Sequence, residues 1–306
     1  MLTRRTVVAA KTEATYGTDP AMTGSNALLA WDVNLDIKGE ILERLYLRDS
    51  LTNLSPVIGM KEVELSFKSE LAGSGGMLAP LISACGFGTG VISGTALAFA
   101  LQSTELNMPS VSLYVYKDGN RHKVTGARGN MKLILEAGKY GIAEFTFKGL
   151  YNPVEAVALM DMGGIGVNKP PICYNSSFQI GGFSPVTSKL ELDLGNEVVS
   201  SPSLNASYGV VSFRISGRKP KISFDADAVV EASNPFWGDW AAHVVDTFSV
   251  DIGATSNRYI VDGIFQYTQN KYADKDGVSK YECEAMLVAS DPTTQNDELA
   301  IKFMNA

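Results

Sequence analysis

Residues 62–68 read Glu-Val-Glu-Leu-Ser-Phe-Lys, a run in which polar and apolar side chains alternate without a break. Successive side chains of a β-strand point to opposite faces, so Val63, Leu65 and Phe67 share one face and the polar residues share the other. The run therefore predicts a half-buried strand. Residues 221–227 read Lys-Ile-Ser-Phe-Asp-Ala-Asp and repeat this pattern, with Ile-Ser-Phe in the place of Leu-Ser-Phe.

The repetition extends beyond these two strands. Asp36 lies 157 positions before Asp193, which is also the separation between the two strands. Farther along, Asn-Arg-His-Lys-Val-Thr-Gly at residues 120–126 returns 137 positions later as Asn-Arg-Tyr-Ile-Val-Asp-Gly. We therefore expect an internal duplication. The smaller second separation predicts about 20 additional residues in the first copy, within residues 86–108.

Alternation of the same kind recurs along most of the chain and predicts a mainly β protein. The alternating runs lie at residues 31–37, 62–68, 111–115, 131–135 and 143–148 in the first copy, and at 190–194, 221–227, 248–252 and 281–287 in the second. We expect an N-terminal arm at residues 1–30, a first domain at 31–160, a linker at 161–180 and a second domain at 181–306.

One helix is expected after each repeated strand. Residues 77–85 place four apolar side chains on one helical face, namely Leu78, Leu81, Ile82 and Cys85. The second helix opens at Asn234-Pro235, where asparagine caps the helix and proline fits its first turn. Its expected buried stripe consists of Phe236, Trp237, Trp240 and Val244. The segments 40–58 and 196–216 lack regular alternation and are expected to be long loops.

Composition and charge argue against several classes of function. The 306 residues include 26 basic and 33 acidic side chains, and the net charge of −7 argues against nucleic acid as a tightly held partner. The longest apolar stretch, residues 91–101, has about half the length of a membrane span, and the N-terminus does not resemble a signal peptide. We therefore expect a protein made in the cytosol without a membrane partner.

The sequence has no motif that predicts catalysis, a cofactor or a metal site. His122 and His243 are the two histidines, and neither lies beside a serine or cysteine in a nucleophile pattern. The three cysteines, Cys85, Cys173 and Cys283, are far apart, which favours buried reduced thiols over a disulfide framework or a zinc site. We expect a protein that is not an enzyme and that binds no cofactor or metal.

The N-terminal quarter resembles a known family. Residues 8–20, Val-Ala-Ala-Lys-Thr-Glu-Ala-Thr-Tyr-Gly-Thr-Asp-Pro, are similar to the start of major tail tube proteins of long-tailed, siphovirus-type bacteriophages. Residues 40–48 and residues 63–75, which end in Glu-Leu-Ala-Gly-Ser-Gly, resemble the same family. The remainder of the chain matches by pattern alone.

The resemblance implies a fold and a role. It implies tandem β-sandwich or half-barrel domains, each with a flanking α-helix, in a structural protein of the virion tail that is made in the host cytoplasm. Family members form stacked six-fold rings through which DNA is ejected, so two copies per chain imply a trimeric ring with pseudo-six-fold symmetry. The implied partners are the chain itself, the tape measure, tail terminator and distal tail proteins, and DNA that passes without sticking.

Two sets of residues are candidates for these roles. The acidic strand residues Glu62, Glu64, Asp225 and Asp227 are candidates for the lumen, where negative charge would repel phosphate. The N-terminal arm and the two long loops would bridge neighbouring rings. The candidate ring-stacking residues of these loops are Glu40, Arg44, Arg48, Asp49, Asn196 and Asn205.

A second hypothesis belongs to a different class of function. The chain would then be a phage or bacterial β-sandwich binding module, such as an adhesin or a carbohydrate binder. In that case Phe236, Trp237 and Trp240 would form an exposed aromatic platform rather than a buried stripe. The solvent exposure of the tryptophans separates the two hypotheses.

Overall fold

The computed structural model describes residues 2, 4–72, 76–163, 169–254, 257–291 and 293–304. The predicted fold class is confirmed, because the chain is mainly β and these ranges contain two short α-helices, α1 (Ala79–Ala84) and α2 (Phe236–Ala241). Two single 3-10 turns, η1 (Gly24–Asn26) and η2 (Glu105–Asn107), complete the helical structure of the described ranges. Within them, no helix has the length and apolar character needed to cross a membrane.

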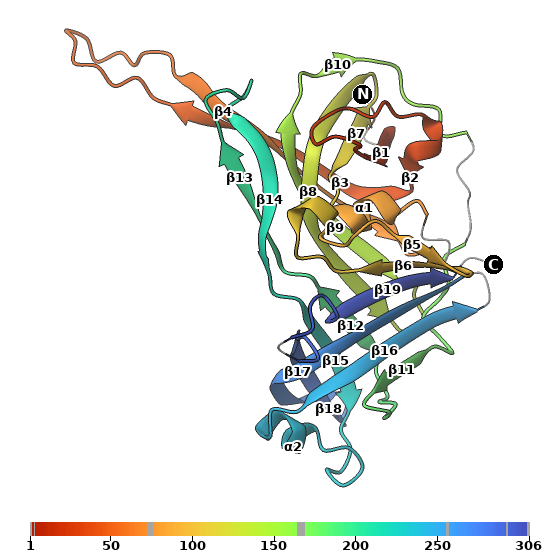
Figure 1. Ribbon diagram of the computed structural model, residues 1–306. Coiled ribbons are helices and arrows are strands. Elements are labelled where there is room, and N and C mark those ends of the chain that lie inside the picture. Colours follow the sequence, from red (N-terminus) through yellow and green to blue (C-terminus); the bar gives the residue numbers. More distant parts are fainter. Residues whose placement is uncertain are drawn as a thin grey trace.

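Strands account for most of both halves of the chain (Figure 1). The first half contains β1 (Thr6–Thr12), β2 (Ala27–Leu28), β3 (Ala30–Leu42), β4 (Val57–Glu70), β5 (Val91–Ser93), β6 (Ala96–Ala100), β7 (Val111–Lys117), β8 (Asn120–Glu136), β9 (Ile142–Tyr151) and β10 (Glu155–Ala156). The second half contains β11 (Ser177–Ile180), β12 (Lys189–Asp193), β13 (Asn196–Pro202), β14 (Val210–Arg218), β15 (Lys221–Asp227), β16 (Val245–Ala254), β17 (Asn257–Lys275), β18 (Val278–Leu287) and β19 (Leu299–Met304).

Eight strands, four from each half, form one continuous antiparallel sheet that we call the long sheet. Its order is β3-β4-β9-β8-β12-β15-β18-β17. The pairing of β8 with β12 at its centre joins the first half to the second. The two halves are therefore connected by a strand ladder and not by a linker alone.

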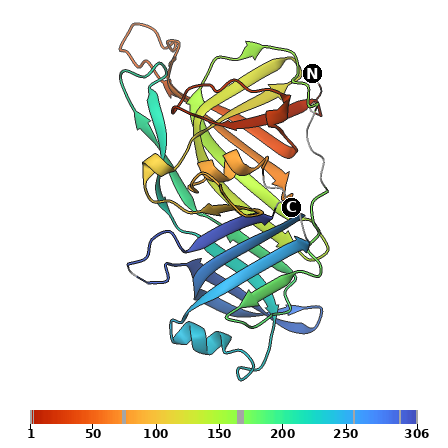
Figure 2. The same ribbon diagram turned by 45° about the vertical axis from the view of Figure 1, so that its right-hand side comes forward.

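A second layer of strands covers the apolar face of the long sheet. β8 and β17 contribute to both layers, because each has an irregular pairing, between Thr125 and Arg128 in β8 and between Tyr267 and Gln269 in β17. The N-terminal parts of β8 and β17 pair with β7 and β16, which pair in turn with β1 and β11. Each half is thus a two-layered β structure (Figure 2).

The halves share their strand order and their pairing registers. Asp36 pairs with Glu64 in β3–β4, and Asp193 pairs with Lys221 in β12–β15, so both partners are displaced by 157 positions. The helices α1 and α2 are separated by the same 157 positions. Three consecutive elements of the first half thus have counterparts in the second half at one constant displacement.

Beyond the helices the displacement falls to 137 positions. Val115 pairs with His122 in β7–β8, and Ile252 pairs with Tyr259 in β16–β17. The difference corresponds to β5, β6 and η2, which lie between α1 and β7 and have no counterpart in the described chain between α2 and β16. β6 pairs with β19, so the additional segment of the first half forms a second strand ladder to the second half.

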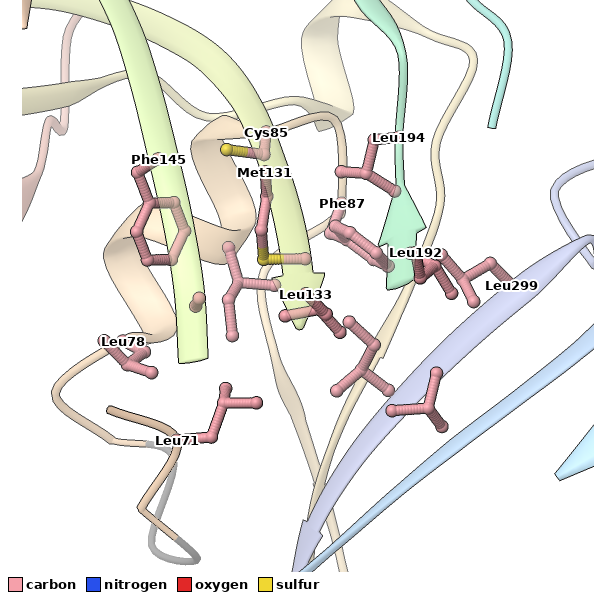
Figure 3. Close-up of a cluster of buried hydrophobic side chains, with 14 of the residues drawn as sticks. Leu71, Leu78, Cys85, Phe87, Met131, Leu133, Phe145, Leu192, Leu194 and Leu299 are labelled. Atoms are coloured by element: carbon pink, nitrogen blue, oxygen red, sulfur yellow. The ribbon is translucent and has the colours of Figure 1, made fainter. Parts of the chain in front are cut away.

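The largest hydrophobic core also spans both halves. Figure 3 shows Met131 and Leu133 of β8 beside Leu192 and Leu194, at the end of β12, and Leu299 of β19. All five side chains are buried. The two halves therefore share a hydrophobic core in addition to the β8–β12 and β6–β19 ladders.

Part of the predicted N-terminal arm is a strand of the body. β1 pairs along its whole length with β7. Val8 and Ala10 enter the main core, whereas Val7 and Ala9 enter a second cluster on the opposite face. Burial of both faces explains why these residues show no polar alternation. The expectation of an arm that is free to bridge rings was therefore wrong for residues 6–12.

The predicted long loop at residues 196–216 is also wrong, because this segment forms a hairpin. β13 and β14 pair with each other and are joined by residues 203–209. The hairpin is rich in serine, which is a weaker strand former than the β-branched and aromatic residues. Its strands are specified by packing against the first half, which a local pattern does not record.

The second helix buries less than its pattern predicts. Phe236 is fully buried, but Trp240 and Val244 are 42% and 37% exposed. The helix ends at Ala241, and His243 has a φ of 55°, so the chain turns away before a second helical turn is complete. The expected stripe therefore fails for Trp240 and Val244.

Candidate functional site

The face of the long sheet that points away from the core carries the predicted lumen candidates. Glu62 and Glu64 lie on β4, and Asp225 and Asp227 lie on β15. We call this surface the polar face. Its carboxylates are Asp32, Asp36, Glu62, Glu64, Glu136, Glu144, Glu191, Asp193, Asp225, Asp227, Glu282 and Glu284, and its lysines are Lys38, Lys68, Lys132, Lys148, Lys189, Lys221, Lys271, Lys275 and Lys280. Carboxylates outnumber lysines, but the positive and negative side chains are interspersed.

Many charges of the polar face are paired across strands. The Lys38 ammonium contacts Glu64, and Lys280 lies 2.7 Å from Asp227 and 3.8 Å from Asp225. Lys68 bridges two strands, at 3.1 Å from both Asp32 and Glu144. The face therefore presents interspersed opposite charges with a small acidic excess, and the four acidic candidates have lysines among their neighbours.

Asp225 has additional partners that fix its ionised form. Burial alone would raise its pKa, but hydrogen bonds from the Ser188 hydroxyl and from the backbone N–H groups of Lys189 and Ser188 outweigh burial, so the pKa lies below its ordinary value. The bond from the Ser188 N–H to Oδ1 measures 2.8 Å. This carboxylate therefore stays charged and holds the loop before β12 against β15.

The β8–β12 ladder at the centre of the long sheet combines apolar and charged contacts. Leu133 pairs with Leu192, and both are buried. On the polar face Lys132 lies 2.7 Å from Glu191, and the Asn130 amide donates to Asp193 over 2.8 Å. Hydrogen bonds from Lys132 and Lys189 lower the pKa of Glu191. The β8–β12 pairing is thus stabilised by apolar contacts on the core side of the sheet and by polar contacts on the polar face.

The hairpin of β13, residues 203–209 and β14 lies across the first half, and we call it the seated hairpin. At its base the Asn196 side-chain amide donates to the carbonyls of Cys85 and Gly129 at 2.7 and 3.0 Å. Farther along, Phe213 is fully buried. Asn196 is half-buried and its amide is bonded within its own chain, whereas Asn205 at the tip is exposed.

Residues 11–20, which are part of the N-terminal segment that resembles a known family, form part of the surface on which this hairpin lies. The buried Glu13 carboxylate accepts hydrogen bonds from the hydroxyls of Ser110 and Ser112, both at 2.6 Å, and from the Gly126 N–H at 2.7 Å. Gly126 has a φ of 58°, and a Cβ there would meet the Tyr16 ring at 2.7 Å, so glycine is required. Glu13 therefore fixes the bend of β8.

Tyr16 connects this bend to the second half of the chain. Its hydroxyl donates to the Gly126 carbonyl and accepts from the Phe213 N–H, both at 2.7 Å. The Arg128 guanidinium lies over the Tyr16 ring at 5.6 Å and bonds to Glu105 at 3.0 Å. Local patterns did not predict this network, although the run of polar residues around Glu13 was recognised as a motif.

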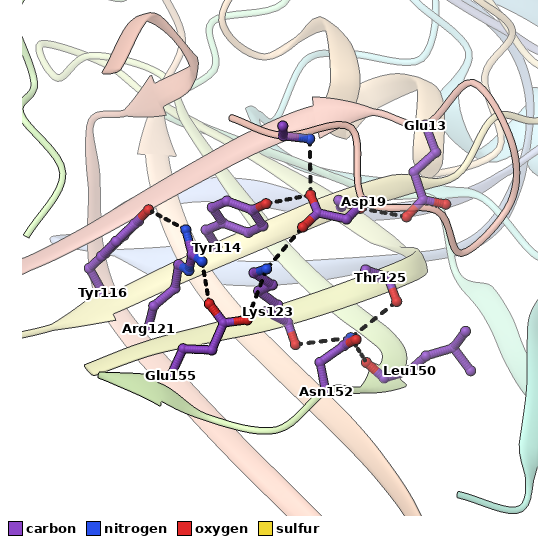
Figure 4. Close-up of polar contacts among 12 residues, drawn as sticks. Glu13, Asp19, Tyr114, Tyr116, Arg121, Lys123, Thr125, Leu150, Asn152 and Glu155 are labelled. Atoms are coloured by element: carbon purple, nitrogen blue, oxygen red, sulfur yellow. Dashed lines mark hydrogen bonds and ion pairs between the residues drawn. The ribbon is translucent and has the colours of Figure 1, made fainter. Parts of the chain in front are cut away.

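A second network holds the end of the motif against the outer strands (Figure 4). Asp19 accepts a hydrogen bond from the Tyr114 hydroxyl and lies 3.1 Å from Lys123. Lys123 also lies 3.0 Å from Glu155, which contacts Arg121. Burial opposes ionisation of Asp19, but the bonds from Tyr114 and Lys123 lower its pKa. These ion pairs attach residues 11–20 to β7, β8 and β10.

The end of β3, the connecting loop and the start of β4 project from the body, and we call residues 40–58 the projecting hairpin (Figure 1). Its candidate residues Glu40, Arg44, Arg48 and Asp49 are exposed. Its large apolar side chains are also exposed, namely Ile41, Leu42, Leu45, Tyr46, Leu47, Leu51, Val57 and Ile58. So many exposed apolar side chains in one segment are typical of a contact with another protein.

A third surface contains aromatic residues next to the end of β17. Trp237 of α2 stacks on Tyr272, with ring centroids 5.4 Å apart, and contacts Trp240 edge-on. Tyr272 is 65% exposed. The aromatic platform of the second hypothesis therefore exists in part, although Phe236 is buried and does not contribute to it.

The family model described as phage tail tube protein matches residues 3–296, which is nearly the whole chain. No curated protein matches the chain. The match extends the N-terminal resemblance across both halves.

Proposed function

Because the chain belongs to the phage tail tube protein family, we propose that it polymerises into stacked rings that form the tail tube of a long-tailed phage, through which DNA is ejected. In this role the protein is structural, and self-association is its function. Tape measure, tail terminator and distal tail proteins are the further partners that such a tube requires. The observation that supports the proposal best is the long sheet, which carries equivalent strands of both halves in one continuous layer.

The internal repeat supports a particular symmetry. The pairing registers recur at fixed displacements of 157 and 137 positions, so each half supplies one equivalent building unit. A ring with six such units contains three chains. Closure of the ring would also remove the sheet edges that otherwise promote aggregation. We expect a trimeric ring with pseudo-six-fold symmetry.

The polar face is the surface proposed to line the lumen, with Glu62, Glu64, Asp225 and Asp227 among its residues. Its ion pairs neutralise many of its lysines, and the excess of carboxylates leaves the surface weakly repulsive toward phosphate. DNA would therefore slide along it without being held. A tube reconstruction that placed these four side chains on the outer wall would contradict this assignment.

The tip of the projecting hairpin, with Arg44, Arg48 and Asp49, is proposed to contact the next ring, together with Asn205 at the tip of the seated hairpin. Negative-stain microscopy of the purified chain tests the function as a whole. We expect rings or tubes with a central lumen. A protein that remains monomeric over a wide range of concentration and salt would contradict the proposal.

A further inference from the structure

The long sheet ends in two edges that have no strand partner among the described residues. β3 pairs with β4 on one side, and residues 269–275 of β17 pair with β18 on one side. Both segments are long, and each leaves a row of backbone N–H and C=O groups on its other side. Such edges pair readily with another strand.

The β8–β12 ladder inside the chain shows how these edges fit together. β12 is the counterpart of β3 at a displacement of 157. The pair Asn130–Thr146 in β8–β9 recurs as Gln269–Glu284 in β17–β18, so the end of β17 corresponds to the end of β8 at a displacement of 139. The displacement is 137 in the first parts of these strands, so β17 has two more residues than β8 in the stretch that contains their pairing irregularities.

On this basis we propose that residues 34–36 of β3 pair with residues 271–273 of β17 in a second copy of this chain. The ladder is antiparallel and reproduces β12–β8 between molecules. The register follows from the two displacements: Asp36 lies opposite Lys271, Leu35 opposite Tyr272, and Asn34 opposite Ala273. The inference rests on the proposed function, since it supplies the contact that closes the ring.

The charges on the polar face suit this register. Inside the chain, Asp193 lies opposite Lys132 and accepts a hydrogen bond from Asn130. The corresponding residues between chains are Asp36, Lys271 and Gln269, which keep the same chemistry: a carboxylate, an ammonium and an amide donor. Unlike charges directly across a ladder stabilise it, whereas like charges oppose it.

The opposite face of the proposed ladder is apolar. Leu35 is half-buried against the core, and its partner Tyr272 is 65% exposed and stacked on Trp237. The equivalent pair inside the chain, Leu192 and Leu133, is buried. The second copy would cover Tyr272 in the same way, which assigns the exposed aromatic surface to assembly rather than to a soluble ligand.

The test is a disulfide across the proposed ladder in assembled protein. Asn34→Cys and Ala273→Cys are introduced together, because directly opposite residues have Cα atoms about 4.5–5.5 Å apart, within the range of a disulfide. The matched control combines Asn34→Cys with Lys271→Cys, a diagonal pair about 7–8 Å apart that is too distant. The natural cysteines are buried, so the unmodified chain gives the background.

We expect oxidation to give covalent dimers and trimers with the first pair, at least tenfold more than with the diagonal pair. Tubes that cross-link as well through the diagonal pair, or through neither, contradict the ladder and leave the tube function intact. Natural chains that form no rings or tubes contradict the proposed function and this ladder with it.

If the cysteine variants fold poorly, exchanging the charges of Asp36 and Lys271 tests the same register through its effect on assembly. Asp36→Lys should reduce assembly at least tenfold, and adding Lys271→Asp should restore it, because the pair is then reversed. The unassembled chain should retain its far-ultraviolet circular dichroism. Absence of rescue in a folded double variant contradicts the register.

Discussion

The seated and projecting hairpins occupy equivalent places in the two halves but differ in what they touch. In the seated hairpin Phe213 is buried and Ile215 is half-buried on the first half. Ile58, the counterpart of Ile215 at a displacement of 157, is 61% exposed, and Ile41 is 68% exposed. Among the described residues, the seated hairpin packs on the first half, whereas the apolar side chains of the projecting hairpin remain exposed. We expect another molecule to supply the surface that covers them.

The largest effect on the isolated chain is expected from Phe213→Ala. The side chain is fully buried between the halves, so its loss should lower the free energy of unfolding by about 3–5 kcal/mol. Urea unfolding of the unassembled protein measures this value. The matched variant in the projecting hairpin is Leu47→Ala, which should change the stability by less than about 0.5 kcal/mol because the side chain is exposed. Equal losses would mean that the hairpins do not differ as described.

Tyr16→Phe should have the next largest effect. The substitution keeps the ring but removes the hydroxyl that joins the Gly126 carbonyl to the Phe213 N–H. We expect a loss of about 1–3 kcal/mol and faster amide exchange at Phe213, measured by hydrogen exchange. Tyr46→Phe in the projecting hairpin is the control and should be neutral. A stable Tyr16→Phe protein with unchanged exchange would refute the role of this hydroxyl.

The β8–β12 ladder should weaken at low pH. Lys132 and Lys189 hold the pKa of Glu191 below its ordinary value of 4.5, so the stabilisation is complete above pH 4.5 and is lost as pH falls through the lowered pKa. Glu191→Gln should cost on the order of 1 kcal/mol at pH 7 and little once wild-type Glu191 is protonated. Unfolding curves across the acid range give this difference. Glu43→Gln in the projecting hairpin is the control, and a cost for Glu191→Gln that does not depend on pH would contradict the prediction.

The smallest effect on the isolated chain, and the clearest effect on assembly, is expected from Ile41→Ser with Ile58→Ser. Both side chains are exposed, so the stability should change by less than about 1 kcal/mol. Loss of their apolar contact with a neighbour should nevertheless raise the protein concentration needed for assembly, which sedimentation measures. Normal assembly of this variant would show that the projecting hairpin does not need its apolar surface.

The sequence predicted the parts of the fold that depend on local alternation. The strand around Leu65, its repeat around Phe224 and the two helices follow from patterns within a few residues. β1 was not predicted, because Val7 to Ala10 are buried on both faces of the strand and show no polar alternation. β13 and β14 were not predicted either, because they are specified by the surface of the first half on which they lie, and its residues are far away in the sequence.

For the candidate site too, the sequence predicted what depends on local alternation and not what depends on strand order. The acidic residues on β4 and β15 were predicted to lie opposite the apolar sides of their strands, and in the structure all four are half-buried on the polar face. The cross-strand lysines that pair with them were not predicted, since Lys280 is separated from Asp225 by more than fifty residues and is brought near by strand order alone. The exposure of Trp240 was missed because helix length is set by the turn at His243 and not by apolar spacing.

If one chain supplies two equivalent units, joined inside the chain by β8–β12 and between chains by a similar ladder, three chains close a ring. Counting the chains in each ring tests it most directly, by native mass spectrometry of isolated rings together with the rotational symmetry of end-on tube images. We expect three chains per ring, with three-fold symmetry that approaches six-fold at the lumen. Six chains per ring would contradict it.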